Sequence, residues 1–279
     1  MNDIEYKISP PRRLAFVDWS ELWRYKDLFW VLAWRDITVR YKQTLLGTAW
    51  ALIQPFVTMV VFTFVFNRVA GITSGDGTPY PIFLYSGLLF WQYFSSTVSG
   101  TSGSMVSNAP LIQKTYFPRL IIPASCAVTG LADFVIASMI LVGMMIYYGF
   151  RPHLAGILIL PILLVCTVMT ALGMGLFLAA LNVRYRDTRH AVPFFVQIMM
   201  YLTPVVYPVS MLKSHAWAKE LMLWINPMSG VITSARAGIT GKAPIDAHML
   251  AISLLASAVL LCAGVCYFTS AEKNFADIL

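Results

Sequence analysis

Long runs without a charged residue are the feature that most limits how this chain can fold. No Asp, Glu, Lys or Arg occurs in residues 43–67, 77–113, 120–132, 152–183, 191–212 and 247–271. A helix needs about 20 mainly apolar residues to cross a bilayer, and most of these runs reach that length. Charged residues make up only 12% of the chain, against roughly a quarter of a soluble domain. The sequence therefore predicts an all-α, polytopic membrane protein and largely excludes soluble enzymes and nucleic-acid-binding domains.

The same runs predict six transmembrane helices. Their expected limits are about 47–66, 82–101, 124–148, 154–181, 192–211 and 249–269. Residues 47–279 then form the transmembrane domain, and residues 1–46 form a cytoplasmic N-terminal segment. An even number of spans puts both termini on one side of the membrane. Placing that side in the cytoplasm collects 14 of the 20 Lys and Arg residues there, so the positive-inside rule predicts cytoplasmic termini.

The segment before the first span predicts a helix that lies along the membrane surface. Asp18 and Glu21 have the spacing of a capping box at its start. Only the seven uncharged residues 28–34 separate Asp27 from Arg35, too few to cross a bilayer. At about 100° per residue, apolar side chains form two stripes, Trp23, Trp30, Trp34, Ile37 and Tyr41 on one and Tyr25, Leu28, Phe29, Leu32 and Val39 on the other. Tryptophans favour the headgroup region, so we expect an interfacial helix; a cytoplasmic helix packed on a partner is the alternative.

The connection between the fifth and sixth spans, residues 212–248, is the longest on the predicted external side. It contains two apolar pieces, residues 221–225 and 228–239, which are interrupted at Asn226 and Pro227. Pieces this short suit re-entrant or interfacial helices better than complete spans. We therefore expect external re-entrant helices between spans five and six.

Asp133 is the one acidic residue deep within a predicted span. Acidic residues inside a membrane are functional candidates by default. However, no Lys, Arg or His is expected at a comparable depth to form a proton relay, and the nearby Ser125, Thr129 and Ser138 could join Asp133 in a helix-packing network. Asp133 therefore either packs helices together or lies on a substrate path, and both interpretations stay open.

The sequence contains no recognisable catalytic, metal or nucleotide-binding motif. The His residues are scattered over loops and helix ends, and the Cys residues lie in apolar segments without nearby ligands. The only Gly-Lys pair, Gly241 and Lys242, lacks the first glycine and the Ser or Thr of a phosphate-binding loop. We therefore predict no enzyme activity and no bound metal or cofactor. If ATP drives transport, ATP and Mg bind to a separate partner subunit.

Three predicted cytoplasmic segments have a composition suited to contact with such a partner. Residues 108–119 combine apolar side chains and two cations between prolines, residues 182–189 carry a dense group of charges, and residues 35–43 form the third segment. Ordinary positive-inside anchoring is the alternative, and composition alone favours it.

Aromatic side chains are frequent in the predicted spans. Flat sugar faces pack well on aromatic rings, but lipid contact and interfacial belts also use such residues. The candidates for lining a substrate channel are Phe62, Tyr85, Trp91, Tyr93 and Tyr201. Helical spacing alone does not choose between the two roles.

Three motifs resemble those of a known family. They are the segment from Trp34 to Trp50 with Gln54 and Pro55, the loop 111–123, and the segment that contains Asn182, Val183, Arg186 and Asp187. Together they look like the permease subunit of type 2 ABC exporters. The closest likeness is to the branch that exports O-antigen, capsule or teichoic acid chains. The motifs occur in the family order and cover nearly the whole chain.

This resemblance implies a homodimeric, six-span permease of the bacterial inner membrane that works with two ATPase subunits. Its cargo would be a polyprenyl-diphosphate-linked polysaccharide, with O-antigen as the first choice. In the family, the N-terminal helix is a gate, the loop between spans two and three couples to the ATPase, and the helices between spans five and six form an external gate. A channel lined by aromatic residues follows the dimer axis.

Carried over to this chain, the family roles fall on particular residues. The gate helix and lipid headgroup contacts would be Trp30, Trp34, Arg35, Arg40, Tyr41 and Lys42. The ATPase-coupling residues would be Leu111, Lys114, Phe117, Pro118, Arg119, Arg186 and Asp187. The external gate would contain Asn226 and Pro227.

Two other functional classes stay open. An exporter of drugs or small lipids with the same fold would share every motif given above. A membrane-embedded transferase is the more remote alternative, because it would need a reactive constellation of carboxylates or His residues, and Asp133 alone supports it weakly.

Overall fold

The structure is a computed structural model that describes residues 19–42, 49–150, 154–185, 187–212, 216–242 and 244–275. These residues form helices and no strands, which confirms the predicted all-α class. The α-helices are α1 (Trp19–Arg24), α2 (Lys26–Lys42), α3 (Ala49–Phe62), α4 (Tyr80–Ser107), α5 (Ala109–Lys114), α6 (Ile121–Tyr147), α7 (Leu154–Arg184), α8 (Thr188–Leu202), α9 (Ala216–Ile225), α10 (Met228–Thr240) and α11 (Ala247–Ala271). A π-helical stretch, η1 (Thr63–Val69), continues α3, and two short 3-10 turns are η2 (Val209–Leu212) and η3 (Glu272–Asn274).

Four helices in the described part of the chain are long and apolar enough to cross a membrane. They are Ala49–Val69, Ile121–Tyr147, Gly156–Arg184 and Ala247–Ala271. These correspond to the predicted spans one, three, four and six. The predicted second and fifth spans fall on α4 and α8, which are not among these four helices. α4, with 28 residues, is long enough but less apolar, and α8, with 15 residues, is too short. The total of six spans therefore stays a prediction.

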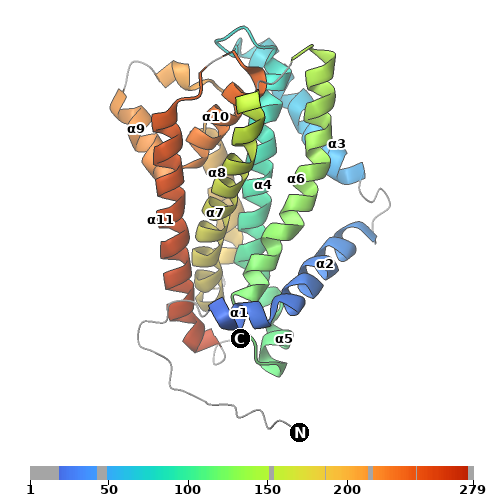
Figure 1. Cartoon of the computed structure of the whole chain (residues 1–279), viewed down its shortest axis with the longest axis vertical. Helices are drawn as coiled ribbons and strands as arrows, with labels where there is room; N and C mark the ends of the chain where they lie inside the picture. Colours follow the sequence, from blue (N-terminus) through green and yellow to red (C-terminus); the bar gives the residue numbers. More distant parts are fainter. Residues whose placement is uncertain are drawn as a thin grey trace.

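α4 lies at the centre of the bundle, where it packs against α6, α7 and α10 (Figure 1). Ser and Thr residues lower its hydropathy, yet most of the helix is buried. Several of their hydroxyls bond to the helix's own backbone: Ser86 donates to the Phe83 carbonyl at 2.9 Å, and Ser104 donates to the Thr101 carbonyl at 2.7 Å. A hydroxyl satisfied in this way is buried at little cost. α4 is therefore enclosed by other helices, which explains why its composition is less apolar.

Glycines bring neighbouring helices into backbone contact. Gly173 of α7 faces Gly264 of α11, and Gly156 of α7 faces Gly238 of α10. A Cβ atom added at Gly173 would lie 2.6 Å from the backbone of Leu260, closer than packed atoms tolerate. Small residues at membrane helix interfaces allow such close approach, and van der Waals packing then stabilises the pair. The α7–α11 and α7–α10 contacts both depend on this close approach.

The predicted fifth span is shorter than expected. α8 ends at Leu202, well before residue 211, and residues 203–208 form turns. Pro204 is the physical reason, since a proline disfavours helical geometry in the residue before it. Thr203 is accordingly extended, with φ −83° and ψ 141°. The apolar run 191–212 therefore contains a helix and an irregular segment.

The two ends of the bundle carry different elements (Figure 1). α1, α5 and the C-terminal part of α11 lie at one end, which we call the α5 end. α9, α10 and the loop before α4 lie toward the opposite end, which we call the α10 end. Elements predicted to be cytoplasmic thus gather at the α5 end, and the side of the membrane to which this end belongs stays a prediction.

Candidate functional site

α2 leans obliquely against α6 at the α5 end of the bundle (Figure 1). On its packed face, Leu32 is buried and Leu28 is half-buried against the ends of the long helices. On its other face, tryptophans are exposed, at Trp30 and Trp34, as is Trp23 of α1. One packed face and one exposed row of tryptophans suit a helix at a membrane interface. Asp18, the expected capping residue, lies outside the described residues.

Arg35 ties α2 to the corner where α4 meets α5. Its guanidinium donates to the Asp36 carboxylate at 2.7 Å and to the Asn108 side-chain oxygen at 3.0 Å. Asn108 lies between the two helices, and its amide nitrogen donates to the Ser104 carbonyl at 2.9 Å. Arg35 and Asn108 thus link α2 to the α4–α5 corner.

Arg40 and Tyr41, near the other end of α2, both contact Asp133 of α6. The Arg40 Nη1 forms an ion pair with one carboxylate oxygen, and the Tyr41 hydroxyl donates to the other. The expectation that no cation reaches the depth of Asp133 is therefore wrong. The expectation inferred the depth of each residue from its position in the sequence. In the structure, α2 is inclined along α6, and Arg40 therefore reaches Asp133.

A cavity of about 330 Å³ adjoins this ion pair between α2, α3, α4 and α6. Its polar and aromatic lining includes Arg40, Tyr41, Trp50, Gln54, Gln92, Tyr93, Ser96 and Asp133. This set offers ring faces, amide and hydroxyl groups and a neutralised charge pair. Within the described residues, no group of three or more His, Cys, Asp or Glu could hold a metal ion. The cavity is equipped for binding through hydrogen bonds and ring contacts.

The structure does not bring the five candidate channel aromatics together. Tyr93 lines the cavity, whereas Trp91 and Tyr85 are buried in the core, and the Tyr85 hydroxyl donates to the Ala137 carbonyl at 2.8 Å. Phe62 packs edge-on against Phe66 with ring centroids 5.5 Å apart. Tyr201 is exposed on α8.

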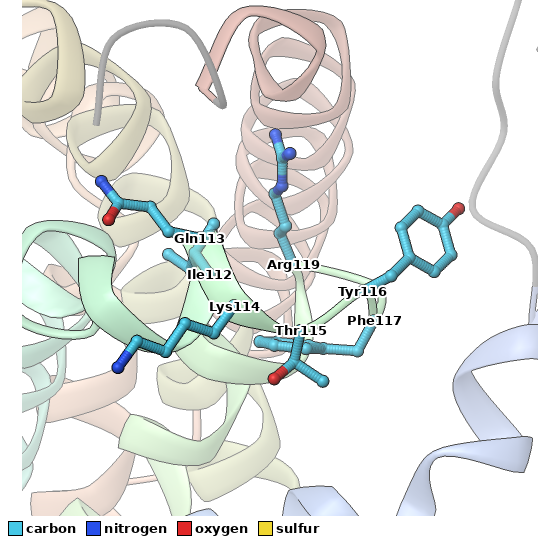
Figure 2. A pocket seen from close by; sticks show the side chains of 7 residues that line it. All are labelled: Ile112, Gln113, Lys114, Thr115, Tyr116, Phe117 and Arg119. Atoms are coloured by element: carbon cyan, nitrogen blue, oxygen red, sulfur yellow. The ribbon is translucent and has the colours of Figure 1, made fainter.

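α5 and the following residues surround a hollow of about 210 Å³ at the α5 end. Phe117 is buried and anchors the loop, and Leu111 and Pro118 are half-buried. Lys114 is exposed, and Tyr116, which is 84% exposed, points away from the hollow (Figure 2). Of the other predicted coupling residues, Asp187 is exposed before α8 and Arg186 lies outside the described residues.

The C-terminal end of the described chain braces this loop. The Arg119 backbone nitrogen donates to a Glu272 carboxylate oxygen at 3.3 Å, and the Arg119 guanidinium donates to the Glu272 backbone carbonyl. Burial raises the pKa of Glu272, and the hydrogen bond and positive charge of Arg119 oppose that rise. Sequence reasoning did not identify Glu272, because the two segments are distant in the chain.

Asn226 and Pro227 lie between the two short helices α9 and α10 that occupy the predicted apolar pieces. The Asn226 amide donates to the Thr203 hydroxyl at 2.5 Å, and its side-chain oxygen accepts from the Met228 backbone nitrogen at 3.2 Å. The α9–α10 junction is thus attached to the point where α8 breaks.

Arg236 of α10 is a structural residue that sequence reasoning missed, since it was counted only as an external charge. It is buried and donates to the carbonyls of Phe83, at 3.0 Å, and Pro204, at 2.6 Å, and also to that of Val205. Its guanidinium lies 3.7 Å from the Phe83 ring centroid. A single cation within an apolar piece next to a proline-broken helix is the signal that could have revealed it.

Comparison with known proteins adds to this geometry. The chain matches the family described as ABC-2 type transporter over residues 27–240. The O-antigen export system permease protein RfbA of Myxococcus xanthus is 31% identical, covering 92% of this chain and 97% of the relative. RfbA of Klebsiella pneumoniae is 28% identical over 91% and 95%. The polysialic acid transport protein KpsM of Escherichia coli is 21% identical over 74% and 78%. The family match includes α2, the cavity and the α5 loop.

Proposed function

Because the chain belongs to the ABC-2 type transporter family, we propose that it is the permease subunit of an ATP-driven exporter of lipid-linked polysaccharide. O-antigen is the first candidate substrate, since two similar relatives are named as O-antigen export permeases. A capsular polysaccharide is the second, since KpsM is named for polysialic acid transport. The chain would act in the bacterial inner membrane as two copies with two ATPase subunits, which bind ATP and Mg.

The double attachment of α2 is the structural observation that carries this proposal. Arg35 connects the helix to the α4–α5 corner, and Arg40 connects it to Asp133 beside the cavity. A movement imposed on α5 by an ATPase would thus reach a polar cavity within the bundle. Transporters need such a connection because ATP hydrolysis and substrate passage take place in different subunits.

The α5 loop is the proposed contact with the ATPase. Buried Phe117 fixes the loop to the bundle, and the Glu272 contacts of Arg119 brace it from the C-terminal side. Tyr116 and Lys114 remain exposed at the end of the bundle, where another subunit can reach them. An exposed aromatic side chain on a braced loop is typical of residues that dominate protein interfaces.

The cations of α2 are the proposed contacts for the diphosphate of the lipid-linked substrate. Arg40 uses Nη1 for Asp133, while its side chain is 45% exposed and a guanidinium carries five N–H donors. Lys42 is exposed two residues further on. Charge-assisted hydrogen bonds to phosphate are stronger than neutral ones, so this end of α2 suits an anionic headgroup.

Deleting the gene for this chain should abolish surface polysaccharide and leave lipid-linked glycan inside the cell. Supplying the chain should restore export, measured by surface carbohydrate staining. With Tyr116→Ala, we expect export to fall by more than about tenfold, because loss of an interface anchor costs roughly 2 kcal/mol or more. The ATPase should then copurify poorly with a normally folded permease.

Tyr147→Ala is the matched control, since Tyr147 is similarly exposed but lies on α6 toward the α10 end. It should leave export and copurification unchanged. Normal ATPase binding by Tyr116→Ala would disprove the coupling role of the loop. Failure of the intact chain to restore any polysaccharide would disprove the proposed function itself.

Lys42→Gln should lower the export rate by about tenfold, the effect of losing one charge-assisted contact of roughly 1.5 kcal/mol. No carboxylate contacts Lys42 among the described residues, so this substitution removes a charge without breaking an ion pair. Assembly with the ATPase, measured by copurification, should be unaffected. Lys26→Gln, on the first turn of the same helix, serves as the control. Equal export by both variants would exclude Lys42 from headgroup binding.

A further inference from the structure

We propose that the cavity between α2, α3, α4 and α6 binds one sugar ring, the ring joined directly to the diphosphate of the lipid-linked glycan. This inference rests on the proposed function and names the part of the substrate that the cavity recognises. Three properties of the cavity carry it: amide groups without partners, a neutralised charge pair, and one exposed ring face in a space of limited volume.

Two glutamine side chains line the cavity without a hydrogen-bond partner among the described residues. Gln92 is the only exposed residue of α4 between Tyr80 and Val98, so its amide opens into the cavity from an otherwise buried helix segment. Gln54 of α3 is also exposed there, and only its backbone carbonyl is used, by Thr58. An amide carries two donors and an acceptor, which match the hydroxyl groups of a sugar.

The charge pair in the wall selects against an anion inside the cavity. The Asp133 carboxylate cancels the Arg40 charge, and the side chain of Asp133 is 26% exposed. A diphosphate inside the cavity would meet repulsion from this carboxylate, whereas the exposed side of the Arg40 guanidinium keeps N–H donors for a diphosphate outside the cavity. A carboxylate has about four acceptor positions, so after contacts with Arg40 and Tyr41 it still accepts hydrogen bonds from hydroxyl groups. A neutral, hydroxylated group therefore fits better than a phosphate.

Ring faces and volume limit the size of the occupant. Trp50 is 55% exposed and supplies the accessible ring face, whereas Tyr93 also lines the cavity but is buried and packs edge-on against Phe134. Aromatic faces pack against the apolar face of a sugar. The volume of about 330 Å³ lies near the lower limit of the roughly 300–1,000 Å³ of small-ligand sites. The cavity thus suits a single ring, and a polymer would have to pass elsewhere.

The position of Arg40 identifies which ring. Arg40 is shared between the cavity wall and the exposed surface, and it is a proposed contact for the diphosphate. A sugar that enters the cavity while its diphosphate lies at Arg40 must be the sugar bonded to that diphosphate. The permease would thereby distinguish a loaded lipid carrier from an empty one.

The test compares two lipid probes on the full-length chain in nanodiscs. One probe is polyprenyl diphosphate, and the other is polyprenyl diphosphate with a single hexose attached. We expect the hexose-bearing lipid to bind about tenfold more tightly, since about one net hydrogen bond is gained. Gln92→Leu should reduce this ratio to below about twofold while leaving the affinity for the sugar-free lipid unchanged. Gln197→Leu, on the exposed surface of α8, is the matched control and should retain the tenfold ratio.

Each other outcome has a definite meaning. Equal binding of the two probes by the wild type would overturn the sugar subsite. Equal weakening of both probes by Gln92→Leu would show that the cavity holds the diphosphate, which also overturns it. If Gln92→Leu is not monodisperse, Gln54→Leu provides the same measurement. Surface polysaccharide in cells is scored separately, so a failed subsite with intact export leaves the proposed function standing.

Discussion

Replacing Arg236 with Met is expected to lower the apparent melting temperature of the detergent-solubilised protein by roughly 10 °C. The guanidinium donates to the carbonyls of Phe83, Pro204 and Val205. Without it, the Pro204 and Val205 oxygens would lose this donor in a buried setting, whereas the Phe83 oxygen would keep the Ser86 hydroxyl. Each unsatisfied buried group costs about 1–3 kcal/mol, so the free energy of unfolding should fall by about 3 kcal/mol or more. Size-exclusion chromatography after heating measures the change.

Arg68→Met is the matched control, because Arg68 is exposed on η1. Its melting temperature should change by less than about 2 °C, as for most surface substitutions. Gly87→Ala tests the same contact from the opposite side, since an added Cβ atom would lie 2.6 Å from the Arg236 guanidinium. Because three hydrogen bonds hold that guanidinium, the alanine should displace it and destabilise the protein. A wild-type melting temperature for Arg236→Met would show that other groups hold α10.

Gly264→Ala should be at least as destabilising, because it forces α7 and α11 apart. The added Cβ atom would lie far inside van der Waals contact with the Gly173 carbonyl oxygen, and a backbone atom cannot rotate away. Overpacking usually costs about 1–3 kcal/mol, and we expect the upper part of this range or more because backbone must move. Thermal unfolding in detergent, followed by the fraction of monodisperse protein, measures the loss.

Gly143→Ala provides the control for this substitution. Gly143 lies within α6, and no atom lies within 4 Å of an added Cβ there. Alanine is the better helix former, so this variant should equal the wild type or gain up to about 1 kcal/mol. If Gly264→Ala and Gly143→Ala behaved alike, the α7–α11 contact would not depend on backbone approach.

The contacts of α10 and those of α2 differ in how firmly they hold each helix to the bundle. Arg236 holds α10 to α4 and to the break after α8, so these elements should move together at the α10 end. α2 packs on the bundle through Leu32, and its polar attachments, Arg35 to Asn108 and Arg40 to Asp133, are partly exposed. Partly exposed ion pairs contribute little stability, which fits the proposal that α2 shifts during transport.

The apolar runs predicted the limits of three long helices well. α6, α7 and α11 begin and end within a few residues of the expected limits. The fifth span was predicted too long, because hydropathy does not register that Pro204 forces Thr203 out of helical geometry. α4 was predicted as a span, yet its enclosure by α6, α7 and α10 is a tertiary property.

The candidate site was predictable in part. Arg40, Tyr41, Tyr93 and Asp133 were each singled out, but from separate arguments about a surface helix, channel aromatics and an intramembrane acid. The structure places all four around one cavity and adds Gln54 and Gln92. Gln54 entered the sequence analysis only as part of the family motif, and Gln92 was not singled out, because a glutamine in an apolar helix carries no periodic signal.

The sequence by itself determined that this protein is a set of membrane helices with its cations concentrated in a few connecting segments. An uncharged run of about 20 residues is apolar enough to enter a bilayer by itself, so its own sequence is sufficient to predict it as a membrane helix. Only the tertiary structure decided which polar groups meet. The ion pair of Arg40 with Asp133 depends on how α2 leans, and the carbonyls that Arg236 binds depend on where α8 breaks. Such contacts join segments far apart in the chain, and their partners are set by helix packing rather than by residue spacing.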